Sequence, residues 1–215
     1  MAQDGAQTKT FEGDAGLTCT GLACLRGGRM LFAGVSLGLV SGEACHITGP
    51  NGMGKSSLIR VIAGLLPAYA GTVNVHGRMA LADERVALDQ GQPLARALAH
   101  WTQLDGTGAD GIGAALSQVD LAHLADVPVR FLSTGQRKRA LLARIQLSGA
   151  AIWLLDEPAN GLDTASIDRL GEMIAAHRAG GGIVLAASHQ PLPMHGAQTL
   201  ALADFVRTDL LEDAE

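Results

Sequence analysis

A glycine-rich loop at residues 49–56 constrains the fold more than any other feature of the sequence. It reads G-P-N-G-M-G-K-S and matches the pattern G-x-x-x-x-G-K-[ST]. Residues 44–48 favour a strand, and after the loop apolar residues recur at helical spacing, namely Leu58, Ile59, Ile62, Leu65 and Leu66. Glycines let backbone N–H groups surround an anion, and the helix directs its positive dipole end at the same point. The sequence therefore predicts a phosphate-binding loop between a strand and a helix.

Two side chains of this loop carry charge or metal-binding chemistry. Lys55 can place its ammonium against the β- and γ-phosphates of a nucleotide, and the hydroxyl of Ser56 can bind Mg²⁺. The glycines of the loop are expected to act through the backbone N–H groups that they leave open to the phosphates. The predicted nucleotide-binding residues are Gly49, Pro50, Asn51, Gly52, Met53, Gly54, Lys55, Ser56 and Ser57.

Two adjacent acids end the apolar segment at residues 152–157, which reads I-W-L-L-D-E. Adjacent carboxylates at the end of a buried strand do not favour stability, because charge is costly to bury. We therefore predict that Asp156 holds Mg²⁺ and that Glu157 orients or deprotonates an attacking water. The alternative is that both acids only cap the structure that follows the strand.

A third segment, residues 132–136, reads L-S-T-G-Q and opens a helix. Taken alone, it is a capped helix start with Ser133 as the N-cap. Three basic residues follow, and we expect them to form a solvated helix face rather than a contact with phosphates: Arg137, Lys138 and Arg139.

In this order, the phosphate loop, the L-S-x-G-Q segment and the acidic strand resemble the motifs of the ATP-binding cassette (ABC) family. The resemblance implies ATP and Mg²⁺ as cofactors. It also implies dimerisation, because the signature segment of a second copy of the chain caps the γ-phosphate, and hydrolysis then lets the two copies separate. The signature residues acting in this way would be Leu132, Ser133, Thr134, Gly135 and Gln136.

Two further positions match the family. Residues 160–163 read N-G-L-D and resemble its D-loop, with Asp163 as the acid. His189 follows an apolar strand, where the family keeps a switch histidine that contacts the γ-phosphate and holds the water. Without the resemblance, an ordinary polar residue at a strand end would be an equally good interpretation of His189. The expected catalytic residues are therefore Lys55, Glu157 and His189.

The length of 215 residues allows one substantial domain. The resemblance implies an α/β P-loop NTPase of the ABC type, with a mainly parallel sheet flanked by helices, a small antiparallel β subdomain and a helical signature subdomain at about residues 83–148.

From hydrophobic patterning we expect strands at residues 17–25, 35–40, 44–48, 72–75, 79–82, 152–155 and 182–187. Helices are expected at residues 94–103, 113–119, 121–125, 135–147 and 165–177. This single domain would span residues 17–207, between a flexible tail at 1–16 and an acidic tail at 208–215.

Two positions depart from the family pattern. Arg26 stands before Gly27 in the first expected hairpin, where the family has an aromatic residue that stacks on adenine. A guanidinium can also stack on a base. The loop after residue 82 lacks the family's glutamine, and we place Arg85 at the equivalent position.

These departures, the small size and two short segments resemble one group within the family, the ATP-binding subunits of the haem exporters of cytochrome c maturation. The segments are G-G-I-V at residues 181–184 and S-H-Q-P-L at residues 188–192. The resemblance implies an ATPase on the cytoplasmic face of the inner membrane that works with integral-membrane subunits. It would energise haem export or the release of a haem-loaded chaperone.

Two alternatives are weighed against this function. One is an ABC transporter for another substrate. The other is a soluble ABC ATPase, which is less favoured because such proteins usually carry two cassettes or a long coiled-coil insertion and this sequence shows neither.

Composition argues against other partners. The formal net charge of −5 offers no general attraction for nucleic acid. The longest stretch without charged side chains, residues 179–203, contains histidines and prolines and does not read as a bilayer helix. Residues 1–16 lack the apolar region of a secretory signal. Haem itself is not expected to bind, because the remaining histidines show no haem-attachment spacing: His46, His76, His100, His123, His177 and His195.

Overall fold

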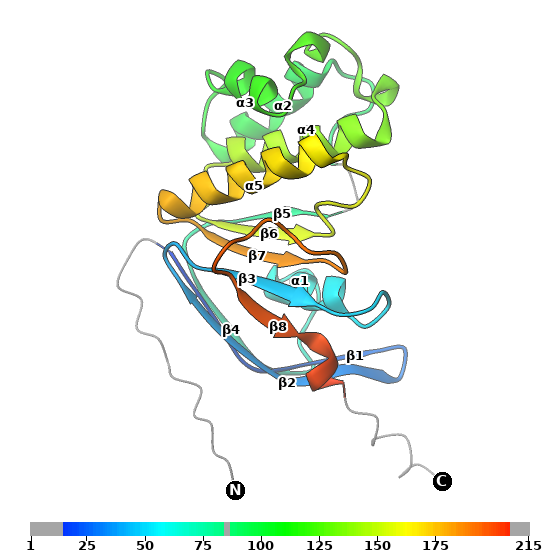
Figure 1. The fold of residues 1–215 in the computed structure, drawn as a ribbon, viewed down its shortest axis with the longest axis vertical. Helices are drawn as coiled ribbons and strands as arrows, with labels where there is room; N and C mark the ends of the chain where they lie inside the picture. The colour runs from blue at the N-terminus through cyan, green and yellow to red at the C-terminus, as the bar shows by residue number, and fades with distance from the viewer. Residues whose placement is uncertain (1–14, 84–86, 207–215) are drawn as a thin grey trace, which may run out of the picture.

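The computed structural model describes residues 15–83 and 87–206. Its centre is a parallel sheet with the strand order β5-β6-β7-β3-β8, and a second, antiparallel sheet has the order β2-β1-β4 (Figure 1). The parallel strands are β3 (Ala44–Thr48), β5 (Met79–Ala82), β6 (Ile152–Asp156), β7 (Ile183–Ala187) and β8 (Gln198–Ala201). The antiparallel strands are β1 (Gly16–Arg26), β2 (Arg29–Val40) and β4 (Ala70–His76).

Strands β6 and β7 are buried along their whole lengths because both faces of the parallel sheet are covered. Trp153 of β6 belongs to a core shared with α5 (Thr164–Ala179). Its neighbour Leu154 belongs to a second core, shared with the antiparallel sheet and α1 (Lys55–Ile62). Successive side chains of a strand point to opposite faces, so a strand covered on both sides needs a continuous apolar run. The predicted parallel sheet with cover on both faces is confirmed.

The turn between β1 and β2 is made by Gly27 and Gly28, which have φ angles of 56° and 77°. Positive φ at both positions suits the tight turn of a β-hairpin and favours glycine there. β2 begins directly after this turn, well before the expected residue 35, because Phe32 pairs with Cys24 across the hairpin. The prediction was too short because a glycine and a basic residue interrupt the apolar pattern at the start of the strand.

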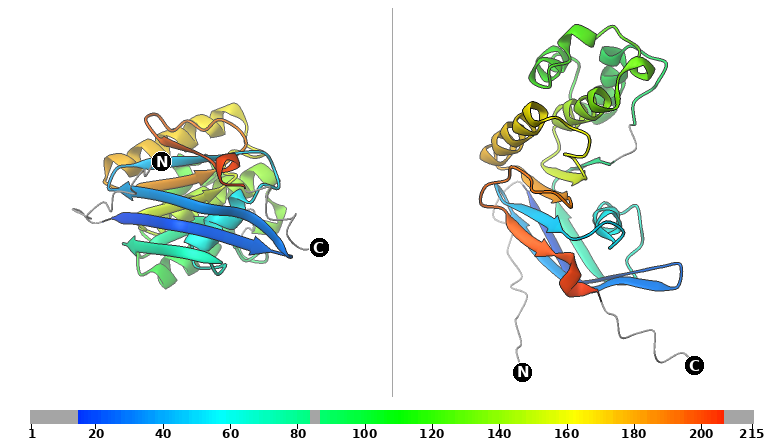
Figure 2. Two further views of the ribbon diagram at one scale, coloured as in Figure 1. Left: turned by 90° about the horizontal axis from the view of Figure 1, so that it is seen from below. Right: turned by 45° about the vertical axis from the view of Figure 1, so that its right-hand side comes forward.

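The helical subdomain and the antiparallel sheet lie at opposite ends of the molecule (Figure 2). Helices α2 (Leu94–Asp105) and α3 (Ile112–Gln118) lie farthest from the antiparallel sheet, and α4 (Thr134–Leu147) contacts both of them as well as β5. Residues 121–125, expected as a helix, form only a short 3-10 turn at Ala122–Leu124. Within the described ranges, none of the helices has both the length and the apolar character needed to cross a bilayer.

Three expectations concern residues at or beyond the ends of the described segments. Ala15 is buried and Gly16 opens β1, so ordered structure begins inside the expected N-terminal tail. The rest of that tail, residues 1–14, lies outside the described residues, as do the acidic tail at 208–215 and Arg85.

We predict that Leu154→Ala lowers the free energy of unfolding by about 2–5 kcal/mol, because Leu154 is fully buried in a central strand whose neighbours cannot collapse into the cavity. Leu65→Ala is the matched control. Leu65 is exposed, so its truncation should change the unfolding free energy by less than about 0.5 kcal/mol. Urea denaturation followed by circular dichroism measures both values. Equal losses for the two variants would contradict this description of the core.

Candidate active site

The carboxyl ends of β3, β7 and β6 lie side by side, because these three strands are neighbours in the parallel sheet. Ala187 of β7 is in register with Ile47 of β3 and with Asp156 of β6. The pairing continues past the strands: Ser188 N donates to Ile47 O at 3.1 Å, and Glu157 N donates to Ala187 O at 2.8 Å. Loops that leave three adjacent strands at one edge form a crevice, which is where open α/β sheets bind ligands.

The loop after β3 turns into α1 at Gly54. This residue has a φ of 106°, and a Cβ there would lie 3.2 Å from the Cβ of Leu31 on β2. Both the conformation and the close approach to β2 favour glycine. No described side chain caps the start of α1, so the N–H groups of its first turn can serve a bound anion.

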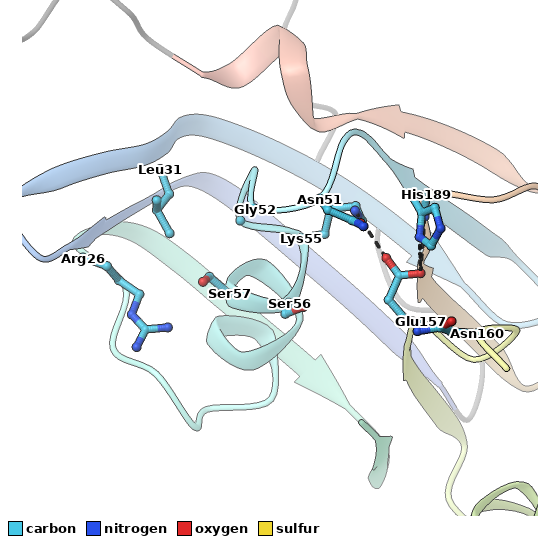
Figure 3. A pocket seen from close by; sticks show the side chains of 11 residues that line it. Arg26, Leu31, Asn51, Gly52, Lys55, Ser56, Ser57, Glu157, Asn160 and His189 are labelled. Atoms are coloured by element: carbon cyan, nitrogen blue, oxygen red, sulfur yellow. Dashed lines mark hydrogen bonds and ion pairs between the residues drawn. The ribbon is translucent and has the colours of Figure 1, made fainter. Parts of the chain in front are cut away.

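Lys55, the first residue of α1, is nearly buried, with 5% of its surface exposed. Its ammonium donates hydrogen bonds to the backbone oxygens of Gly49 at 2.8 Å and Pro50 at 3.2 Å. It also lies 3.3 Å from Oε1 of Glu157 (Figure 3). A buried cation therefore stands between the glycine-rich loop and the acid that follows β6.

Glu157 is held from two sides. His189 Nδ1 lies 2.9 Å from Oε2, and the backbone N of His189 donates to the same oxygen at 3.4 Å, while Lys55 contacts Oε1 (Figure 3). Burial alone raises the pKa of Glu157, but the hydrogen bonds from His189 and Lys55 and the Lys55 charge outweigh it and hold that pKa below its ordinary value. The carboxylate is therefore ionised at neutral pH.

Asp156 and Ser56 form a second polar pair beside the loop. Ser56 Oγ donates to Asp156 Oδ1 at 2.9 Å, and Asp156 is only 4% exposed. Burial raises the pKa of Asp156, the Ser56 hydrogen bond and the Arg60 charge oppose this, and the charge of Glu157 adds to the rise. A hydroxyl and a carboxylate oxygen at hydrogen-bond distance are hard donors of the kind that Mg²⁺ prefers. A bound divalent cation would favour the ionised carboxylate. The pair thus fits the predicted metal site.

A cavity of about 470 Å³ is lined by Lys55, Ser56, Glu157 and His189, whereas Asp156 lies behind Ser56 and is not part of the lining. Glu157 and His189 lie at one end of it, and Arg26 and Leu31 lie at the other (Figure 3). Of the predicted nucleotide-binding residues, six line it: Asn51, Gly52, Gly54, Lys55, Ser56 and Ser57. Gly49 and Pro50 instead accept from the Lys55 ammonium, and Met53 is not part of the lining.

Sequence reasoning missed two residues of this lining, Leu31 and Asn160. Asn160 could have been found, because it belongs to the N-G-L-D segment that resembles the D-loop. Leu31 gave no local signal, since it reaches the cavity only through the pairing of β2 with β1.

The predicted signature residues lie outside the lining of this cavity. Ser133 and Gln136 form a reciprocal capping box: Gln136 N donates to Ser133 Oγ at 3.2 Å, and Ser133 N donates to Gln136 Oε1 at 2.8 Å. Leu132 is buried, whereas Ser133 and Thr134 are exposed. The start of α4 is therefore an ordered, solvent-facing helix N-terminus.

Asp163 lies at the start of α5, where its Oδ1 accepts a hydrogen bond from Ser166 N at 2.8 Å. This bond holds the pKa of Asp163 below its ordinary value. In this structure Asp163, the acid predicted for the D-loop, is the N-cap of α5.

The expectation of a solvated basic face after the signature is wrong for two of the three residues. Lys138 Nζ donates to the backbone oxygen of Glu157 at 2.9 Å. Arg139 donates to the backbone oxygen of Val119 at 2.9 Å and forms an ion pair with Asp120 at 3.3 Å. Sequence periodicity could not show that α4 lies between α3 and the loop after β6. Lys138 therefore contacts that loop, and Arg139 contacts the end of α3.

Comparison with known proteins identifies the family. A family model described as ABC transporter matches residues 32–160. The cytochrome c biogenesis ATP-binding export protein CcmA of Zymomonas mobilis subsp. mobilis is 55% identical over 195 residues, covering 90% of this chain and 87% of that protein. The protein of the same name from Novosphingobium aromaticivorans is 52% identical over 192 residues, covering 89% of this chain and 98% of that protein.

Solved structures agree on the fold. A Pyrococcus furiosus protein assigned as an ABC transporter ATP-binding protein superposes with a TM-score of 0.80 at 22% identity, covering 89% of this chain and 100% of that one. The resemblance seen in the sequence is thus confirmed at the levels of fold, family and group. This chain belongs to the ABC transporter family and, within it, to the cytochrome c biogenesis ATP-binding export proteins.

Proposed function

We propose that this chain binds MgATP in the cavity beside α1 and hydrolyses it to energise an ABC exporter of c-type cytochrome biogenesis. The observation that carries the proposal is the Glu157 carboxylate held between Lys55 and His189 at the edge of a phosphate loop. The assignment to cytochrome c biogenesis is supported by two export proteins of that process, which are 55% and 52% identical to this chain. The energised step would be haem export or the release of a haem-loaded chaperone. This follows from the resemblance of residues 181–184 and 188–192 to the haem exporters.

The geometry supports a division of roles in hydrolysis. Glu157, ionised at neutral pH, accepts or directs the proton of an attacking water, and His189 fixes the carboxylate and faces the same end of the cavity. Lys55 places its charge where the β- and γ-phosphates would lie. Mg²⁺, bound through Ser56 and Asp156, would neutralise charge that develops on the phosphate oxygens.

A second copy of the chain is the partner that completes the site. Ser133, Thr134 and Gly135 lie at a helix N-terminus outside their own chain's cavity, so a role at a γ-phosphate requires a nucleotide held by another copy. Two copies related by a two-fold axis would each supply a phosphate loop to one site and a signature to the other. ATP then stabilises the closed dimer, and its hydrolysis removes that stabilisation.

The remaining partners follow from the transport role. Integral-membrane subunits would carry the cargo, and this chain would bind them peripherally at the cytoplasmic face of the inner membrane. Nucleic acid is not a proposed partner, and haem itself is not proposed to bind this chain. The alternative is an exporter for a different substrate, because the residues of the nucleotide site would contact ATP and not the transported molecule.

Glu157→Gln should reduce steady-state ATP turnover by about 10²–10⁴-fold, because the amide cannot accept a proton from water. ATP binding should persist, and the ATP-bound protein should accumulate as a dimer, detected by size-exclusion chromatography with light scattering. Asp204→Asn is the control, since it also neutralises an acid but lies far along the chain in a 3-10 turn (Leu202–Phe205) and outside the cavity lining. Normal turnover by Glu157→Gln would refute the role of Glu157.

Arg26→Ala should raise the Kd for ATP by roughly 2- to 30-fold, the range expected when a stacking cation is removed. Arg26 lines the far end of the cavity from Glu157, where a nucleotide base would lie if its phosphates lay at α1 (Figure 3). Calorimetric titration of ATP into the Glu157→Gln background gives the affinity without turnover. Arg29→Ala is the matched control on the other side of the Gly27-Gly28 turn, and equal effects of both substitutions would contradict a base contact.

Affinity purification from detergent-solubilised membranes should recover this chain together with integral-membrane transporter subunits, because the proposed motor has no cargo path of its own. Mass spectrometry identifies them, and the same purification from the soluble fraction is the control. Recovery with ribosomes or nucleic acid instead would contradict the transporter assignment.

A further inference from the structure

The first turns of α4 contact the loop that carries Glu157 in the same chain. Lys138 Nζ donates a hydrogen bond to the backbone oxygen of Glu157 at 2.9 Å. One turn earlier, a Cβ at Gly135 would lie 3.4 Å from the backbone oxygen of Gly161, so helix and loop are in close contact there as well. The helix that presents the signature therefore also touches the loop after β6 at two positions, Glu157 and Gly161.

The backbone of Glu157 is in an unfavourable conformation. Its φ of 49° lies in the left-handed region, which non-glycine residues adopt at a cost. Such a conformation persists only where surrounding contacts fix it. Three hydrogen bonds do so: its N donates to Ala187 O at 2.8 Å, and its O accepts from Asn160 N at 3.2 Å and from Lys138 Nζ.

The conformation of this residue decides where its side chain points. With φ at 49°, the carboxylate reaches Lys55 on one side and His189 on the other. Of the three backbone hydrogen bonds, the one from Lys138 is charge-assisted, and it is the one made by a side chain. Its loss would leave the Glu157 carbonyl with the longer bond from Asn160 and weaken the hold on the strained backbone.

We propose that Lys138 is a positioning residue for hydrolysis, which fixes the backbone of Glu157 and so aims its carboxylate at the attacking water. Lys138 lies outside the lining of the cavity, and the contact through which it would act is its hydrogen bond to the backbone oxygen of Glu157.

A further consequence rests on the proposed function. Ser133 and Gly135 would contact the γ-phosphate held by a second copy, while Lys138 on the same helix holds Glu157 of its own chain. Helix α4 would then connect the signature at one site of the dimer with the position of the base at the other site.

The test compares steady-state ATP hydrolysis by the purified protein and its Lys138→Met variant. Methionine keeps an unbranched apolar stem but lacks the terminal ammonium, so it removes the donor. We expect kcat to fall about 10- to 100-fold, as misplacement of a catalytic group does, while KM for ATP stays within about twofold. Lys138→Arg, which keeps a cationic donor, should restore most of kcat.

Arg137→Met is the matched control. It removes the preceding cation from the same helix turn, and within the described residues the Arg137 side chain makes no hydrogen bond or ion pair. Its kcat should stay within about twofold of wild type. Thermal unfolding of all variants, and ATP-dependent dimerisation in the Glu157→Gln background with and without Lys138→Met, separate a positioning role from loss of fold or of assembly.

The outcomes are distinct. Selective loss of kcat in Lys138→Met, with rescue by Lys138→Arg and with dimerisation retained, supports the proposal. Unchanged kcat in Lys138→Met, or a loss that tracks a lowered unfolding temperature and is not rescued by arginine, overturns it. Absence of ATP hydrolysis in the wild-type protein would instead overturn the proposed function, and normal wild-type activity with an unaffected Lys138→Met would overturn this inference alone.

Discussion

The site depends on the parallel pairing of three adjacent strands. β7 lies between β3 and β6, and Ala187 is in register with residues of both neighbours, so the phosphate loop, the acidic pair and His189 leave the sheet at one edge. A shift of one residue in either pairing would turn the following side chains to the opposite face. The register is strongly fixed because side chains of these strands are buried in separate cores on the two faces of the sheet.

The central elements could be predicted because their signals are local. The phosphate loop, β6 and the start of α4 each show their chemistry within a few consecutive residues. β8 gave no such signal, because it is only four residues long, half of them exposed, and it exists through pairing with β3. Lys138 was misread for the same reason: its partner, the Glu157 carbonyl, is brought near by the packing of α4.

Helix α4 connects the parts of the molecule that the function must coordinate. Arg139 binds the end of α3, and Arg144 donates to the backbone oxygen of Leu81 in β5 at 3.0 Å while its guanidinium lies 4.0 Å from the ring of Trp101 in α2. Burial lowers the pKa of Arg144, but nearby acids oppose that change, and the guanidinium stays charged. Together with Lys138 at its first turns, these contacts fix α4 to both the helical subdomain and the parallel sheet.

Adjacent residues at the end of β6 are given opposite electrostatic surroundings. Asp156 is buried with a hydroxyl as its hydrogen-bond partner, and burial raises its pKa. Glu157 also pays a desolvation penalty, but the Lys55 cation and His189 reverse its effect and lower the pKa. For Asp156 the Ser56 hydrogen bond and the Arg60 charge oppose the effect of burial without reversing it, whereas for Glu157 the adjacent ammonium and His189 do reverse it. This difference follows from where the two side chains point, and it suits the two roles proposed for them, a metal ligand at Asp156 and a base at Glu157.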